Sequence, residues 1–196
     1  MTLQERFPLL LTNPDYATSD LLEFSAVRDG FIVVTIYAAM ASLQALISAL
    51  LVIGNFTFAL ITFFGSFFFI YVIWVVLTAL LHLASAFWGG SGDLVSTFGA
   101  VGLGAAPMIV VSVLSILATV IGGTILSDDP ESVMPLINLL MALLGAAWGW
   151  PGLMCYYTLK NVELMEPRRS FIITMTAFLI LAAFEIANSN ILSLDF

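Results

Sequence analysis

Long apolar stretches alternate with short polar breaks along this sequence. After a polar beginning, apolar segments occupy residues 31–53, 56–88, 96–126, 133–160 and 170–192. None of them alternates apolar and polar residues in the way of a half-buried strand, so each is expected to form a helix. The first would extend ~34 Å at about 1.5 Å per residue, enough to cross a hydrocarbon core of about 30 Å. The pattern predicts an all-α bundle of five transmembrane helices.

The polar breaks define the expected domain organisation. A five-helix membrane domain at residues 31–192 follows an N-terminal cytoplasmic or interfacial segment at 1–30 and precedes an external tail at 193–196. The clearest breaks are a glycine-rich loop at 89–93 and an acidic loop at 127–132.

The N-terminal segment contains several helix signals. Pro8 and Pro14 are expected to break the chain, and residues 13–16 (Asn-Pro-Asp-Tyr) to form a turn. Asp20 and Glu23 resemble a capping pair that begins a short helix. This helix is expected either to lie at the membrane interface or to lead directly into the first span.

The composition supports a lipid environment. The chain of 196 residues is 61% apolar and only 9% charged, with a mean hydropathy of +1.11. Soluble domains are about 45–50% apolar and about 25% charged. The net charge of −8 argues against nucleic-acid binding, which requires basic patches.

The basic residues indicate an orientation. Arg6 and Arg28 precede the first span, whereas Lys160, Arg168 and Arg169 lie between the fourth and the fifth. Four crossings place both groups on one face of the membrane, as the positive-inside tendency expects. The sequence therefore predicts a multi-pass protein with its N-terminus inside and its C-terminus outside. Its location would be the plasma membrane of a prokaryote or an endomembrane of a eukaryote.

Few residues suggest chemistry. His82 and Cys155 are the single histidine and the single cysteine, on different expected spans. A hydrolytic triad or a zinc site needs more groups than these, so no catalytic residue, cofactor or metal is expected. His82 is either a helix-end histidine bonded to a carbonyl or water, or a group in the bundle interior that senses protons or substrate. An intramembrane enzyme would need two catalytic side chains within hydrogen-bond reach, and the sequence pairs none.

Glu185 is the carboxylate inside an expected span. It lies ~24 Å beyond Arg169 along a helix, which places it near the outer interface. Two readings remain: an interfacial or capping carboxylate, or a buried polar contact.

Glycine and proline positions suggest close and bent helices. In the loop, Gly89, Gly90 and Gly92 imitate a phosphate loop but lack its Lys-Ser/Thr ending, so a flexible turn is expected. Small residues spaced four apart let helices approach closely in lipid, and prolines bend them. These residues, on the third and fourth spans, are Ala100, Gly104, Pro107, Gly145, Gly149 and Pro151. They serve either plain packing or a moving, substrate-passing bundle.

A family resemblance rests on the order of these motifs. His82 with Ala84 is followed by the glycines at 89–92, and then by a small-residue stretch from Phe98-Gly99 through Gly104 to Pro107. This order resembles the Yip1-domain family of five-span membrane proteins, to which residues 13–16 and 167–169 are also similar. The resemblance implies an inside N-terminus and no known catalytic residues. Eukaryotic relatives bind Rab-type small GTPases through a long N-terminal region, whereas this chain has about 30 residues there, which argues against that partner.

Two functions follow as expectations. The first is a non-enzymatic membrane-organising or trafficking-type scaffold, which contacts the lipid bilayer and binds other membrane proteins or further copies of itself. The alternative is a transporter or channel for a small solute or a lipid, with the bent third and fourth helices lining the path.

Overall fold

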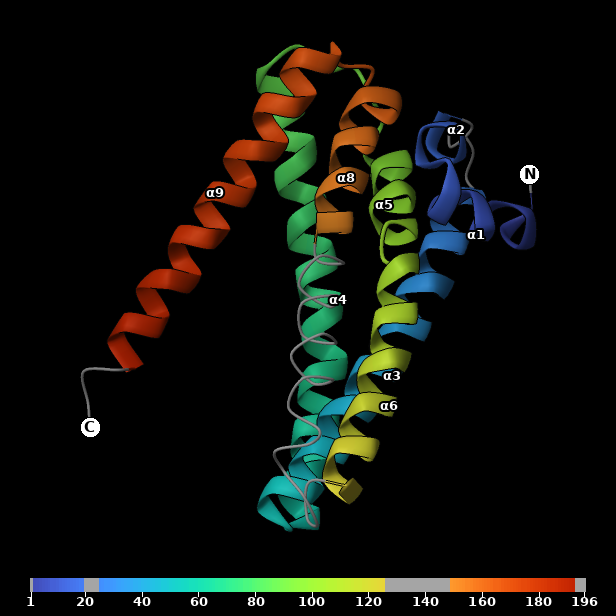
Figure 1. Cartoon of the computed structure of the whole chain (residues 1–196). Coiled ribbons are helices and arrows are strands. Elements are labelled where there is room, and N and C mark those ends of the chain that lie inside the picture. The colour runs from blue at the N-terminus through green and yellow to red at the C-terminus, as the bar shows by residue number, and fades with distance from the viewer. Residues whose placement is uncertain (1, 20–24, 126–148, 193–196) are drawn as a thin grey trace.

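The described part of the molecule is helical throughout. The computed structural model describes residues 2–19, 25–125 and 149–192 (Figure 1). Its helices are α1 (Leu3–Thr12), α2 (Pro14–Ser19), α3 (Ser25–Ile53), α4 (Phe56–Phe87), α5 (Leu94–Leu103), α6 (Ala106–Ile125), α8 (Gly149–Tyr157), the π-helix η1 (Thr158–Val162) and α9 (Pro167–Leu192). The predicted all-α class is confirmed for these residues.

Three stretches are long and apolar enough to cross a membrane. They are Ala26–Ile53, Phe56–Phe87 and Leu94–Ile121, and the last includes both α5 and α6. The most apolar part of α4 has no buried residue. An apolar helix with its surface exposed requires hydrocarbon rather than water around it. The structure therefore supports a membrane protein, as predicted. Much of the expected fourth span, with the acidic loop and Gly145, lies outside the described residues.

The beginning of the chain differs from expectation. The prediction that Pro8 breaks the chain is wrong, because Pro8 lies inside α1. Both Pro8 and Gln4, whose carbonyl loses its usual helical donor, are exposed, so water can replace the missing hydrogen bond. Asn13 ends α1, and its side-chain oxygen accepts a hydrogen bond from the Tyr16 amide at 3.3 Å. The turn expected at residues 13–16 is thus the connection between α1 and α2, and it includes the first turn of α2. Asp20 and Glu23 lie outside the described residues.

Glycines bring α3 and α5 into backbone contact. A Cβ atom on Gly30 would lie 2.6 Å from the Gly99 carbonyl oxygen, and one on Gly102 would lie 2.8 Å from the Gly30 Cα. Side chains at these positions would separate the two helices, since real Cβ atoms do not approach so closely. Ala100, which the sequence singled out, is fully buried in the core beside this crossing.

The third apolar segment bends at Gly104-Ala105. There α5 ends and α6 begins, with Pro107 in the first turn of α6, where the missing amide costs no helical hydrogen bond. Pro151 similarly lies in the first turn described for α8. A Cβ on Gly104 would lie 3.1 Å from the Met154 Cβ, so this bend packs against α8.

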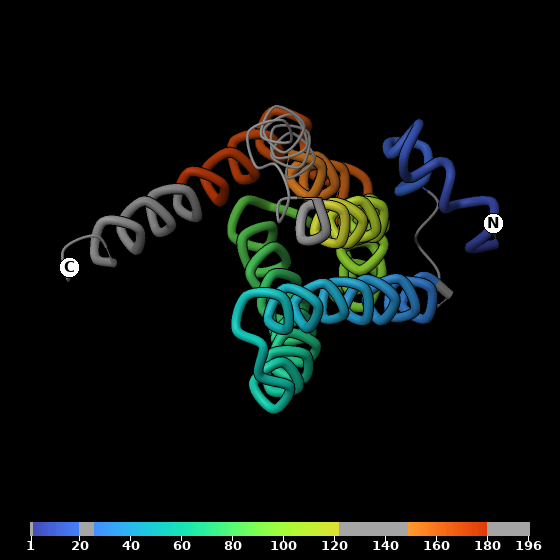
Figure 2. Tube along the Cα trace, turned by 60° about the horizontal axis from the view of Figure 1, so that its bottom comes forward, coloured from blue at the N-terminus to red at the C-terminus, as the bar shows by residue number. Residues whose placement is uncertain are grey.

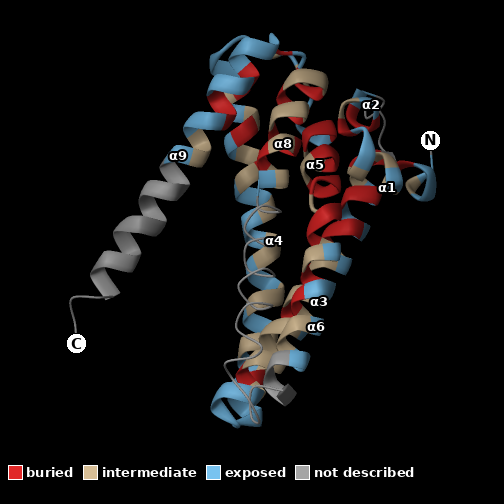
Figure 3. Cartoon of the chain, in the orientation of Figure 1, coloured by how far each residue is buried: buried red, intermediate tan, exposed pale blue. Residues whose placement is uncertain are grey.

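The helices form a bundle with two outlying parts. In Figure 2, α1 and α2 lie at one side and α9 diverges from the bundle at the other. Figure 3 shows that buried residues concentrate at the end carrying α2, α5 and α8, which is the upper end in Figure 1. We call this the loop end, because the glycine-rich loop and η1 lie there. It holds the candidate site.

Candidate functional site

The glycine-rich loop begins at the C-terminal end of α4, which has a regular hydrogen-bonded cap. Trp88 caps α4, and Gly89 has a positive φ of 84°. The Gly90 amide donates to the Ser85 carbonyl at 2.8 Å and the Gly89 amide to the Ala86 carbonyl at 3.5 Å. These are the two hydrogen bonds of a Schellman motif, in which glycine adopts the left-handed conformation at low cost. Gly89 and Gly90 therefore turn the chain sharply at the end of α4.

Gly92 lets the loop cross closely over Glu163. A Cβ on Gly92 would lie 2.6 Å from both the Cα and the Oε2 of Glu163. The Ser91 amide donates to the Glu163 carbonyl at 3.0 Å. The loop then ends at Asp93, whose carboxylate accepts from the Ser96 amide at 3.1 Å and caps α5. Any larger side chain at Gly92 would lift the loop from this carboxyl group.

Glu163 is positioned by the end of a π-helix. The Glu163 amide donates to the Thr158 carbonyl at 3.1 Å, which ends η1. Leu164, with a φ of 54°, then turns the chain towards α9. Glu163 is fully buried. Its side chain therefore points into protein rather than into solvent.

Three side chains from two other helices surround the Glu163 carboxyl group. Oε1 lies 2.7 Å from the His82 Nδ1 and accepts a hydrogen bond from the Thr97 hydroxyl at 2.6 Å. Oε2 accepts from the Ser85 hydroxyl at 2.7 Å. We call these four residues the Glu163 cluster. A buried carboxyl group is costly without partners, and this cluster supplies them from both α4 and α5.

The order of the groups bears on catalysis. In a Ser-His-Asp triad, the imidazole lies between the hydroxyl and the carboxylate, so it can take the hydroxyl proton. Here the carboxyl group lies between the hydroxyls of Ser85 and Thr97 and the imidazole of His82. The hydroxyls donate to a carboxyl group that is itself covered by the loop. This arrangement ties three segments together, and its order differs from that of a hydrolytic triad.

A second polar contact joins α2 to the other side of η1. The Lys160 Nζ lies 2.9 Å from both carboxylate oxygens of Asp15. The side-chain amide of Asn161 donates to Asp15 Oδ1 at 2.9 Å and to the Thr18 hydroxyl at 2.7 Å. The hydrogen bonds from Lys160 and Asn161 lower the pKa of the Asp15 carboxyl group. We call this the Asp15 contact.

The N-terminal segment is also held by a buried ion pair. The Arg6 Nη1 lies 3.3 Å from Asp29 Oδ2, and both side chains are almost fully buried. Arg28, which is exposed, lies 3.3 Å from the other oxygen of Asp29. The segment expected to be cytoplasmic or interfacial is packed on the bundle over residues 2–19.

A cavity lies away from these polar groups. Its volume is about 290 Å³, and its wall comes from α3, α4, α8, α9 and the α5–α6 bend. Gly104 and Pro151 line it, whereas His82 does not. Its lining side chains are mostly hydrocarbon, and none of those described is charged.

The structure brings together only some of the residues that the sequence singled out. His82, Gly89, Gly90 and Gly92 lie at or over the Glu163 cluster, and Gly104 and Pro151 lie at the cavity. Gly149 has open space around it. Glu185 belongs to α9, but its side chain lies outside the described part. Among described residues, no group of three or more His, Cys, Asp or Glu residues could hold a metal ion.

Sequence reasoning missed Glu163, Ser85, Thr97 and Asp15. Ser85 follows His82 by three residues and so shares its helix face, which was an available signal. Glu163 lies 81 residues from His82, and no spacing rule connects them.

Comparison with known proteins identifies one family. The family model of the Yip1 domain matches residues 9–187, nearly the whole chain. No curated protein and no solved structure matches the chain.

Proposed function

Because this chain belongs to the Yip1 domain family, we propose that it is a non-enzymatic, five-span scaffold that binds other membrane proteins. The Glu163 cluster carries this proposal. The Glu163 carboxyl group is hydrogen-bonded to three side chains of the same chain and lies buried beneath the glycine-rich loop. A catalytic or transport site would instead present such groups to a substrate.

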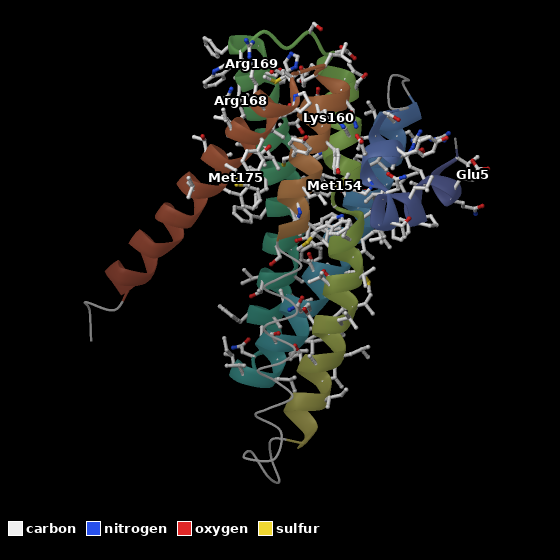
Figure 4. The ribbon with its side chains drawn as sticks, turned by 45° about the horizontal axis from the view of Figure 1, so that its top comes forward. Glu5, Met154, Lys160, Arg168, Arg169 and Met175 are labelled. Carbon is white, nitrogen blue, oxygen red and sulfur yellow. The ribbon has the colours of Figure 1, made fainter. Side chains whose placement is uncertain are left out.

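The positions of the basic residues support the orientation with the N-terminus inside. Lys160, Arg168 and Arg169 lie at the loop end (Figure 4). α3 also begins near this end, with Arg28 in its first turn. Basic residues gathered at one end favour a cytoplasmic loop end. Under this orientation α3, α4, the α5–α6 pair, the segment ending in η1, and α9 are the five spans.

The outer face of α4 is the proposed partner surface. The small residues of α3 and α5 are already used within the chain, whereas a Cβ on Gly65 would meet nothing within 4 Å. Exposed apolar side chains surround Gly65, including Ile61, Phe68 and Phe69. A glycine on an open apolar face lets a partner helix approach closely in lipid.

Affinity capture from native membranes after mild detergent extraction tests this surface. We expect the wild type to retain defined membrane proteins or a second copy, and Gly65→Trp to lose them. Leu80→Trp is the matched control, since Leu80 is an exposed residue of the same helix farther from Gly65. Recovery of a lone monomer from the wild type would contradict the scaffold.

One observation favours the alternative, a transporter. The cavity is lined by Gly104 at the α5–α6 bend and by Pro151 of α8, as a path between these helices would be. Its apolar wall would suit a lipid rather than a polar solute. Flux through liposomes that is abolished by filling the cavity would favour this alternative over the scaffold.

A further inference from the structure

The cavity between the α5–α6 bend and α8 is large and partly open. Well-packed cores have few voids larger than a water molecule. An apolar cavity of about 150 Å³ stays free of water and binds benzene or xenon, and this one measures about 290 Å³. Its α4 wall, within a candidate membrane span, consists of Ile70, Ile73, Trp74, Leu77 and Leu81. In a membrane, α4 is surrounded by the acyl chains of lipids. An acyl chain is therefore the occupant that this apolar wall favours.

Thr174 adds a polar group to the wall. Its side chain lines the cavity and is 2% exposed, and its hydroxyl has no hydrogen-bond partner among the described residues. Other helical threonines donate to the carbonyl four residues earlier, as Thr78, Thr158 and Thr176 do. A buried hydroxyl without a partner costs free energy. An occupant with an acceptor oxygen would remove that cost.

The charge at the loop end indicates where a head group would lie. Arg168 is exposed and has no ion-pair partner within the described part of the chain, whereas Arg169 donates to the Trp88 carbonyl and pairs with Glu166. Figure 4 shows both arginines at the upper end of α9, above Met175. Arg168 lies about 9 Å from Thr174 along the helix axis and about 120° around it, so its long side chain reaches the head group from the exposed side of α9. A basic side chain at the membrane surface attracts anionic head groups.

From these observations we propose that the chain binds one anionic phospholipid at this site. One acyl tail fills the cavity, an ester carbonyl accepts a hydrogen bond from the Thr174 hydroxyl, and the phosphate lies at Arg168. The three parts follow the order of a phospholipid from the membrane surface inwards. The proposal is independent of the scaffold, because the cavity and the outer face near Gly65 are formed by different residues.

Native mass spectrometry of the purified full chain with added phosphatidylglycerol tests the tail. Ala177 lines the cavity, so Ala177→Phe would fill part of it, whereas Met175→Phe places the same ring on an exposed position of α9. We expect one lipid per chain in the wild type and in Met175→Phe. Ala177→Phe should bind at least about tenfold more weakly.

Two further variants test the polar parts. Thr174→Val keeps the shape and removes the hydroxyl, with Thr176→Val as the matched control, because Thr176 is exposed and bonded within its own helix. We expect only Thr174→Val to weaken binding, by a fewfold. Arg168→Gln should abolish the preference for phosphatidylglycerol over phosphatidylcholine.

Thermal unfolding with and without lipid separates binding from folding. Added phosphatidylglycerol should raise the midpoint of the wild type but not of Ala177→Phe, which should be as stable as the lipid-free wild type. A wild type that retains no lipid, or an Ala177→Phe variant that binds as tightly as wild type, would overturn the proposal. Equal binding by Thr174→Val would do the same for the ester contact, and none of these results would affect partner capture through Gly65.

Discussion

The Glu163 cluster and the Asp15 contact are neighbouring polar sites that differ in burial. Both use the segment around η1: Lys160 and Asn161 bind Asp15, and two residues later Glu163 binds His82, Ser85 and Thr97. The Glu163 side chain is 1% exposed, whereas that of Asp15 is 47% exposed. Water can replace the partners of Asp15 but not those of Glu163. The comparison teaches that one site holds the fold together and the other can be lost at little cost.

The largest expected effect follows from removing the buried carboxyl group. Glu163→Ala would remove the carboxyl group that joins His82, Ser85 and Thr97 and would open a void. The two hydroxyls would keep only backbone carbonyls of their own helices as acceptors, so the link between the segments would be lost. Each buried group that loses its hydrogen-bond partner costs about 1–3 kcal/mol, and the void adds to this loss. Thermal unfolding in detergent micelles measures the loss, with Glu163→Gln as the volume-matched control. A variant as stable as wild type would show that the cluster does not hold the bundle.

An intermediate effect is expected from the loop. Gly92→Ala would force a Cβ against Glu163, and overpacking of this kind costs about 1–3 kcal/mol. The same unfolding measurement should show no loss for Gly65→Ala, since a Cβ there meets nothing within 4 Å. Equal stabilities for the two alanine variants would contradict the close crossing over Glu163.

The smallest effect is expected at the exposed contact. Asp15→Asn removes the charge that attracts Lys160, and an exposed ion pair contributes about 0.2–1 kcal/mol. The loss should shrink as salt is added, because salt screens exposed charges. A loss as large as that of Glu163→Ala would invalidate the comparison by burial.

Acid should weaken the Asp15 contact in a defined direction. The hydrogen bonds from Lys160 and Asn161 lower the pKa of Asp15 in the folded chain, below an unfolded value of about 3.9. The contact therefore contributes its full stability above that value and loses it as the pH falls through the lowered folded pKa. The difference in unfolding midpoint between wild type and Asp15→Asn should be constant near neutral pH and vanish in strong acid. A difference that grows on acidification would contradict the sign.

The sequence predicted elements better than it predicted partners. Long apolar runs indicate helices in lipid because the backbone must satisfy its own hydrogen bonds there, and the run expected at 56–88 corresponds to α4 (Phe56–Phe87). Asn55 begins this helix and Gly89 ends it, and both signals are local. Pro8 was misjudged because proline commonly ends a helix, whereas α1 continues through it with the Gln4 carbonyl exposed to water.

Contacts between segments far apart in the chain could not be predicted from the sequence. His82 stood out as the single histidine, but its partner Glu163 is on a segment that composition marks only as polar. The small-residue spacing selected Ala100 and Gly104, whereas the closest backbone approach uses Gly30 with Gly99 and Gly102. Spacing on one helix gives a face, but the partner of that face depends on how the helices pack.

A double-mutant cycle between His82 and Glu163 tests most directly whether the Glu163 cluster stabilises the packing of the helices. Unfolding of His82→Ala, Glu163→Gln and the double variant gives the coupling free energy between the two side chains. We expect a coupling of about 1.5–3 kcal/mol, within the range for groups in one hydrogen-bond network. Additive losses, with no coupling, would contradict the account.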